Sequence, residues 1–266
     1  MPDQSGGPQA VVGVSLKSYF DYQQTLAWCA QVAALPILAA VRDSARAEVF
    51  VLPSFPAIAP SLGVLAPSGV HVGAQTVSAY ASGAHTGDVS ATTLAQIGAT
   101  LALTGHAERR RDYAETDAIV AAQLAATLAA GLCPVVCVGE PQPGPVSEAI
   151  QWCLRQLSAA LSDVPRTAGA RIIVAYEPVW AIGAQNPAPD EHIQQVCAEL
   201  SGFLNSSPAS SDRSAVIYGG SAGPGQLRRL FGPVRGLFLG RFAHDVLGLA
   251  GVLKDTMQCL DDESPS

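Results

Sequence analysis

Charged and aromatic residues are both scarce in this chain of 266 residues. Asp, Glu, Lys and Arg make up 14% of it and aromatic residues 6%, whereas 48% is hydrophobic. Basic residues number 15 against 22 acidic ones, which gives a formal net charge of −7 at pH 7. A chain with so few cations has no global positive field, so we expect no nucleic-acid partner. An anionic ligand would need a local cationic site instead.

Membrane and disulfide signals are also lacking. The opening MPDQSGGPQA has no apolar core, so we expect no secretory leader there. The uncharged run 118–139 is interrupted by Gly131 and Pro134, which favours a helix followed by a buried strand over a membrane span. The six cysteines form no Cys-x-x-Cys motif, and Cys133 and Cys137 share one strand face and cannot readily bond. We therefore expect reduced, buried thiols in a cytoplasmic protein with no membrane partner.

Short apolar runs recur along the chain, separated by Ala-, Leu- and Gln-rich stretches of helical period. The runs are 11–15, 48–52, 70–74, 100–104, 133–138, 171–176, 215–219 and 236–240. Helices are predicted between them, for example over 115–130, 146–162 and 191–205. Eight such units predict an α/β fold, a single (β/α)8 barrel over residues 1–266 with frayed ends at 1–9 and 261–266. The alternative, an open doubly wound sheet, normally has a G-x-G-x-x-G turn after its first strand, where this chain has VGVSLK.

Polar residues follow several runs at the strand ends where barrel enzymes place their active sites. Lys17, after the first run, could neutralise a phosphate or an oxyanion, although a lone lysine is more often a solvated surface residue. His106 follows the fourth run, and a helix beginning at Ala107 would hold its imidazole neutral and able to donate to a carbonyl. A hydrogen-bonded structural histidine is the alternative. No two of the five histidines have metal-ligand spacing, so no metal site is expected.

Glu177 follows the sixth run and precedes a proline. A partly desolvated carboxylate there is suited to act as a general base, and the alternative is a structural salt bridge with Arg171. The next residues, 178–187, predict a mobile lid in which Trp180 is an anchor and Gly183 offers a backbone amide to a ligand.

Glycine-rich turns follow the seventh and eighth runs, as Gly219-Gly220-Ser221 and Gly240-Arg241. Barrels bind phosphate at these two positions through backbone N–H groups. One Gly-Gly pair is weak evidence for a phosphate site, but two such turns after consecutive runs are stronger evidence together. The strand ends therefore carry a cation, an imidazole, a carboxylate and these turns. Together they predict an enzyme that moves a proton on a small phosphorylated substrate without a cofactor.

With these residues placed, the chain resembles the triosephosphate isomerase family over nearly its whole length. The matching segments are GAQ (73–75), HTGDVS (85–90), GHAERR (105–110), CVGE (137–140), YEPVWAIG (176–183) and YGGS (218–221). The resemblance implies a TIM barrel with Lys17 as the electrostatic stabiliser, His106 as the electrophile and Glu177 as the base.

The resemblance also implies binding and supporting roles. The residues expected to bind substrate or phosphate are Ser15, Gly183, Ser221, Gly240 and Arg241. Those expected to support the site are Glu108, which would pair near Lys17, and Tyr218, Gly219 and Gly220. Thr86, on the long third loop, would reach a partner subunit and support its active site, so a homodimer is implied.

The chain also departs from the family pattern: Ser15 replaces the usual Asn, Ala107 the usual Ser, Arg241 the second Gly of loop eight, and the lid tip is Ala184-Gln185-Asn186 instead of Thr-Gly-Lys. Three features, namely Ser15 before the lysine, Pro224-Gly225 in loop seven and Gly240-Arg241 in loop eight, resemble one branch of the family, L-erythrulose-1-phosphate isomerase. That branch shifts a carbonyl along a four-carbon ketose phosphate through an enediol. Ser15 would open space for the extra carbon.

The predicted reaction is therefore the conversion of L-erythrulose 1-phosphate to D-erythrulose 4-phosphate. One alternative is an ordinary triosephosphate isomerase that interconverts dihydroxyacetone phosphate and glyceraldehyde 3-phosphate in glycolysis. Another is a non-catalytic relative with a binding role, but such a protein should have lost Lys17, His106 or Glu177, and all three are present.

Overall fold

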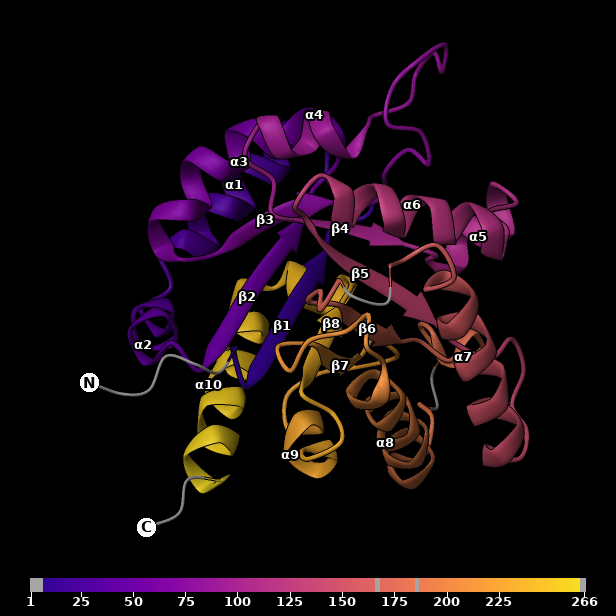
Figure 1. The fold of residues 1–266 in the computed structure, drawn as a ribbon. Helices are drawn as coiled ribbons and strands as arrows, with labels where there is room; N and C mark the ends of the chain where they lie inside the picture. The colour runs from indigo at the N-terminus through magenta and orange to yellow at the C-terminus, as the bar shows by residue number, and fades with distance from the viewer. Residues whose placement is uncertain (1–6, 166–167, 185–186, 264–266) are drawn as a thin grey trace.

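A closed barrel of parallel strands forms the centre of the molecule (Figure 1). The computed structural model describes residues 7–165, 168–184 and 187–263. Strands pair in chain order and β8 returns to β1, which confirms the predicted TIM barrel. The strands are β1 (Ala10–Ser15), β2 (Ala47–Leu52), β3 (His71–Ala74), β4 (Leu101–Thr104), β5 (Cys133–Val138), β6 (Ile173–Tyr176), β7 (Ala215–Tyr218) and β8 (Gly236–Leu239).

Helices surround the barrel and cover its outer face (Figure 1). The predicted helices 115–130, 146–162 and 191–205 are confirmed as α6, α7 and α8, with no end shifted by more than two residues. The α-helices are α1 (Tyr22–Ala33), α2 (Ile37–Ser44), α3 (Ile58–Leu65), α4 (Ala91–Gln96), α5 (Ala107–Asp112), α6 (Asp117–Ala129), α7 (Val146–Ala160), α8 (Asp190–Ser206), α9 (Gln226–Leu230) and α10 (Val246–Glu263). Short 3-10 helices are η1 (Phe55–Ala57), η2 (Ala66–Ser68), η3 (Val179–Ala181) and η4 (Arg241–His244).

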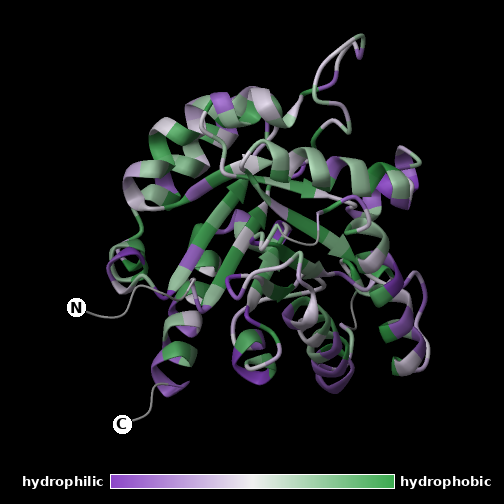
Figure 2. Cartoon of the chain, in the orientation of Figure 1, coloured by the Kyte–Doolittle hydropathy of each residue, from purple (hydrophilic) through white to green (hydrophobic). Residues whose placement is uncertain are grey.

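The strands are mostly hydrophobic (Figure 2), and residues on both of their faces are buried, as their near-continuous apolar sequences predict. One apolar cluster fills the barrel and includes Val11, Phe50 and Phe238, while a larger one lies between the strands and the helices. Gly13 makes the interior packing possible, because a Cβ there would lie 2.2 Å from the Phe50 ring. The strands therefore form a packed core whose loops are free to build a site.

Residues 7–9 and 261–263, parts of the two segments predicted to be frayed, are described by the structure. Helix α10 continues to Glu263, where Arg235 Nη1 lies 2.9 Å from the carboxylate, so a frayed segment from residue 261 is wrong for 261–263. Gln9 is likewise held, since its N–H donates to the Arg46 carbonyl at 2.7 Å. The remaining ends, 1–6 and 264–266, lie outside the described residues.

All six cysteines are free, and five of them are buried, as expected. The uncharged stretch 118–139 is helix α6 followed by strand β5. In the described part of the chain no single helix is long and apolar enough to cross a membrane, although the bent pair α1 and α2 passes that test together by length and composition.

Candidate active site

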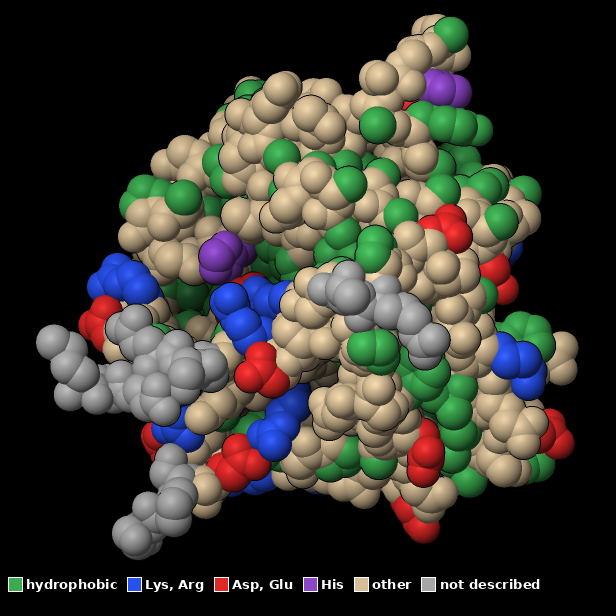
Figure 3. All heavy atoms as spheres, in the orientation of Figure 1, with side chains coloured by type: hydrophobic (Ala, Val, Ile, Leu, Met, Phe, Trp, Pro, Cys, Tyr) green, Lys and Arg blue, Asp and Glu red, His purple; other side chains and the backbone are tan. Residues whose placement is uncertain are grey.

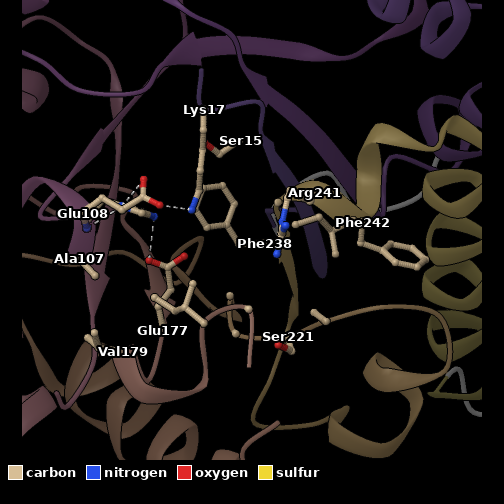
Figure 4. Close-up of a pocket in the computed structure, with 18 of the residues that line it drawn as sticks. Ser15, Lys17, Ala107, Glu108, Glu177, Val179, Ser221, Phe238, Arg241 and Phe242 are labelled. Atoms are coloured by element: carbon tan, nitrogen blue, oxygen red, sulfur yellow. Dashed lines mark hydrogen bonds and ion pairs between the residues drawn. The ribbon is translucent and has the colours of Figure 1, made fainter. Parts of the chain in front are cut away.

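A cavity of about 640 Å³ opens among the loops that follow β1, β4, β6, β7 and β8 (Figure 4). It brings together eleven residues that the sequence singled out: Ser15, Lys17, His106, Glu108, Glu177, Gly183, Gly219, Gly220, Ser221, Gly240 and Arg241. Tyr218 and Thr86 do not line it. Parallel strands end on one face of the barrel, so residues far apart in sequence meet there.

Lys17 is held in a strained backbone conformation. Its φ is +49°, a left-handed value that costs a non-glycine residue roughly 1–2 kcal/mol. Gln75 Nε2 donates to the Lys17 carbonyl at 2.8 Å, and Lys17 Nζ lies 2.6 Å from Glu108 Oε1. The ion pair with Glu108 that the resemblance implied is therefore present, and it fixes the ammonium at the cavity wall.

His106 is the N-cap of α5, which begins at Ala107 as predicted. The Glu108 N–H donates to His106 Nδ1 at 3.2 Å. A ring nitrogen that accepts this bond carries no proton, so the proton of the neutral imidazole is on Nε2. Nε2 lies 3.5 Å from Glu177 Oε2, which leaves a potential donor beside the carboxylate.

Glu177 is a buried carboxylate at the cavity wall. It is 5% exposed, and Oε2 has no hydrogen-bond partner among the described residues. Gly219 makes room for it, because a Cβ there would lie 2.7 Å from Glu177 Cγ. Burial, and then the nearby Glu177 carboxylate, hold the pKa of the Cys137 thiol well above its usual value, so that neighbour stays uncharged.

The salt bridge between Glu177 and Arg171, which the sequence left open, is not formed. Arg171 Nη2 instead lies 2.8 Å from Glu48 Oε2. Glu48 is near the start of β2 and Arg171 precedes β6, so this pair lies at the opposite end of the barrel from the cavity. No Lys or Arg pairs with Glu177 among the described residues.

The other side of the cavity is built by glycine-rich turns and one arginine. Gly183 has a φ of +67°, and the Ser221 hydroxyl donates to the carbonyls of Ala181 and Ala184 at 3.1 and 3.3 Å. Arg241 begins η4, lines the cavity and places its guanidinium carbon 5.9 Å from the centre of the Tyr19 ring. In the described part of the chain it forms no ion pair, so it is an uncompensated cation available to an anion.

The lid predicted over 178–187 is described only in part. It begins with η3 and continues to Ala184, whereas its predicted tip residues Gln185 and Asn186 lie outside the described residues. Ile182, Gly183 and Ala184 line the cavity, so this side of the segment faces the site.

Tyr218 and Thr86 have different positions from the rest. Tyr218 ends β7 and is buried, with no hydrogen-bond partner for its hydroxyl among the described residues, and burial raises its pKa. It supports the turn above it, since a Cβ at Gly220 would lie 2.2 Å from the Tyr218 oxygen. Thr86 lies on the exposed loop between β3 and α4, which projects from the body of the molecule (Figures 1 and 3).

Sequence reasoning missed two polar residues that shape the site. Gln75 holds the Lys17 backbone, and Glu140, after β5, accepts hydrogen bonds from Tyr176 and Trp180 on either side of Glu177. Both lay inside segments that carried the family resemblance. Glu140 also follows an apolar run, as Glu177 does, so the same strand-end signal could have found it.

Comparisons with a family profile, with known sequences and with solved structures agree with one another. The sequence profile of the triosephosphate isomerase family matches residues 10–255. L-erythrulose-1-phosphate isomerase of Pectobacterium atrosepticum is 45% identical over 245 residues, covering 92% of this chain and 94% of that protein. Triosephosphate isomerase of Thermus thermophilus is 40% identical over 182 residues, covering 67% and 73%. The crystal structure of triosephosphate isomerase from Bartonella henselae superposes with a TM-score of 0.76 and 26% identity, covering 94% of this chain and 99% of that one.

Proposed function

Because the chain belongs to the triosephosphate isomerase family, it is a sugar-phosphate isomerase, and we propose that it converts L-erythrulose 1-phosphate to D-erythrulose 4-phosphate. The observation that carries the substrate assignment is the similarity to the Pectobacterium enzyme, which runs over 92% of the chain. A non-catalytic relative, the third alternative from the sequence, is set aside because the family and these relatives are isomerases.

The proposed reaction moves one carbonyl, one proton between carbons and one proton between oxygens. The Glu177 carboxylate takes the proton from C3 of the ketose, while His106 Nε2–H and the Lys17 ammonium stabilise the negative charge that develops on the C2 oxygen. His106 gives its Nε2 proton to the C2 oxygen and recovers one from the C3 hydroxyl, and Glu177 returns its proton to C2 as the carbonyl forms at C3, so the product is an isomer and no electrons are lost. Positioned side chains suffice for these steps, and we propose no metal or organic cofactor.

The phosphate would lie at the opposite side of the cavity from the base. Backbone N–H groups at Gly183, Ser221 and Gly240 are the proposed ligands, with Arg241 as the nearby cation. The proposal is supported by the absence of any carboxylate pairing with Arg241 among the described residues. We further propose that the lid closes over the phosphate and excludes water from the reacting carbons.

The second candidate is triosephosphate isomerase itself. It is favoured by the 40% identity to the Thermus enzyme and by chemistry that needs the same base and electrophile. The two candidate functions are distinguished by measuring the isomerisation rates of dihydroxyacetone phosphate and L-erythrulose 1-phosphate side by side. Rapid turnover of the triose and none of the tetrulose would overturn the first proposal.

Ser15→Asn is expected to harm the four-carbon substrate more than the three-carbon one. Ser15 is buried at the end of β1 and lines the cavity, so a larger amide there would fill space that the extra carbon needs. One carbon group in a pocket is worth about 1–3 kcal/mol, so we expect the ratio of kcat/KM values to shift by roughly 10-fold or more toward the triose. Equal losses on both substrates would contradict this role.

Arg241→Gly is expected to raise KM for both sugar phosphates by about 10-fold, because a cation near the phosphate is lost. The effect should be larger at low ionic strength, where charge attraction is less screened. Arg213→Gly makes the same change in charge in the loop before β7, away from the cavity, and should leave KM unchanged. An equal rise in both variants would assign the effect to net charge alone.

We propose that the protein is a cytoplasmic homodimer. The projecting loop that carries Thr86 is exposed from Tyr80 to Asp88, and such a loop gains burial only when it docks on another surface. Thr86 would then contact the partner's site. Analytical ultracentrifugation of the protein and of Thr86→Arg tests this, and a monomeric wild type would exclude it.

A further inference from the structure

Tyr19 is a large aromatic residue at the mouth of the cavity. It lies in the loop after β1, two residues beyond Lys17, and it lines the cavity although it is 53% exposed. None of the proposed chemical steps involves it. Its neighbours in the cavity wall indicate what it does there.

The Tyr19 ring lies beside the guanidinium of Arg241. The guanidinium carbon is 5.9 Å from the ring centre, within the range of a cation–π interaction. The guanidinium also approaches the loop after β6, because a Cβ at Gly183 would lie 3.6 Å from Arg241 Nη2. In the described part of the chain Arg241 forms no hydrogen bond or ion pair, so the Tyr19 ring is what attracts this cation there.

An arginine side chain without an anchor samples many rotamers. Restricting it to one of them when a ligand binds costs conformational entropy, and this cost weakens binding. An aromatic face attracts the cation and favours the rotamers that keep it close. A guanidinium already held at the cavity can therefore direct two N–H groups at a phosphate with a smaller loss of entropy.

The Tyr19 ring is itself held by a cluster of rings that reaches η4, the short helix that begins with Arg241. His244 meets Tyr19 edge-on, with ring centroids 5.3 Å apart, and also packs against Phe20 with centroids 4.4 Å apart. Trp28 packs against Phe20 and donates from Nε1 to a backbone carbonyl of η4 at 3.0 Å. The cluster thus joins the loop that carries the tyrosine to the helix that carries the arginine.

His244 enters this cluster as a neutral ring. Burial, and then the Arg241 charge, lower the pKa of His244 below its usual value. Near neutral pH Arg241 is therefore the only charged side chain among the four residues of η4. No second cation on this helix repels the guanidinium from the Tyr19 ring.

We propose that Tyr19 is a positioning residue that holds the Arg241 guanidinium at the cavity and so strengthens the binding of phosphorylated ligands. The inference rests on the proposed role of Arg241 as the cation near the phosphate. It requires no movement of the segment after β6 and does not depend on which sugar phosphate is converted. Because the ring acts through the guanidinium, its loss should weaken binding and leave proton transfer by Glu177 intact.

The test compares Tyr19→Leu, which removes the ring but keeps an apolar side chain, with Tyr19→Phe, which keeps the ring and removes the hydroxyl. Calorimetry with glycerol 3-phosphate, a phosphate ester with no carbonyl to isomerise, measures Kd at low ionic strength. We expect Tyr19→Leu to raise Kd by about 4-fold, the factor for an exposed cation–π contact, and Tyr19→Phe by less than about 1.5-fold. On the sugar phosphate that the wild type converts, KM of Tyr19→Leu should rise by the same factor while kcat changes by less than about 1.5-fold.

Arg241→Gly separates a role through the guanidinium from a direct contact with the ligand. Once the guanidinium is absent, adding Tyr19→Leu should raise Kd by less than about 1.5-fold. Losses that multiply in the double variant would overturn the proposal, because the ring would then act independently of Arg241. A Phe variant as weak as the Leu variant would also overturn it, by assigning the effect to the hydroxyl.

Tyr113→Leu is the matched control. The Arg109 guanidinium carbon lies 4.5 Å from the Tyr113 ring centre, and this exposed pair does not line the cavity, so Kd should stay at the wild-type value. Binding of glycerol 3-phosphate that Tyr19→Leu leaves unchanged would reject the role of Tyr19 alone. The expected changes in Kd without turnover of either sugar would reject the proposed function alone, and no binding to the wild type would reject both.

Discussion

Glu177→Asp is expected to lower kcat by about 100-fold with little change in KM. The substitution shortens the side chain by one methylene and retracts the carboxylate by roughly 1 Å from the carbon that it deprotonates. The surroundings cannot correct this, because Glu177 is buried between fixed backbone segments and its main chain is tied to β5 by a bond from its N–H to the Val138 carbonyl at 2.8 Å. Steady-state rates on the preferred sugar phosphate measure the loss.

Glu148→Asp is the matched control for this experiment. Glu148 is exposed in the first turn of α7, away from the cavity, so the same shortening there should leave kcat unchanged. If Glu177→Asp also kept the wild-type kcat, Glu177 could not be the base. The remaining carboxylate in the cavity, Glu108, would then need the same test.

Gly219→Ala is expected to lower kcat by a similar factor, about 100-fold, although it changes no functional group. A Cβ at this position would lie 2.7 Å from Glu177 Cγ and 2.8 Å from Oε1. Carbon atoms do not approach so closely, so the carboxylate must move away from its position beside His106. The loss should appear in kcat, because the proposed phosphate ligands are Gly183, Ser221 and Gly240 and not Gly219.

Gly202→Ala controls for the general effect of adding a methyl group. Gly202 lies exposed in α8, and a Cβ there would meet no atom within 4 Å. This variant should keep the wild-type kcat and gain about 0.5–1 kcal/mol in the free energy of unfolding, since alanine favours the helix. A Gly219→Ala enzyme as active as Gly202→Ala would show that the position of Glu177 is not set by this contact.

Most of the cavity could be predicted because its residues follow strands. The eight apolar runs are the eight strands, and the polar residues that follow them meet because parallel strands all end on one face. Lys17 and His106 were therefore expected in one site despite their separation in the chain. The helix that begins at Ala107 was also visible in the sequence, and it supplies the N–H that leaves His106 with its proton on Nε2.

Pairing between distant side chains could not be predicted in the same way. Arg171 was a plausible partner for Glu177, but they lie on opposite ends of β6, and barrel closure brings Arg171 to Glu48 instead. The direction of Arg241 toward the cavity depends on η4, a short helix with no sequence signal of its own.

The sequence by itself determined the barrel, the order of its strands and the residues at their functional ends, because hydrophobic period and strand polarity are local properties of the chain. Only the tertiary structure decided which donors reach Glu140, why Gly219 is needed beside Glu177, and that the last turn of α10 is held by Arg235. These depend on distances of a few ångströms between segments far apart in sequence, and closing the barrel is what sets those distances.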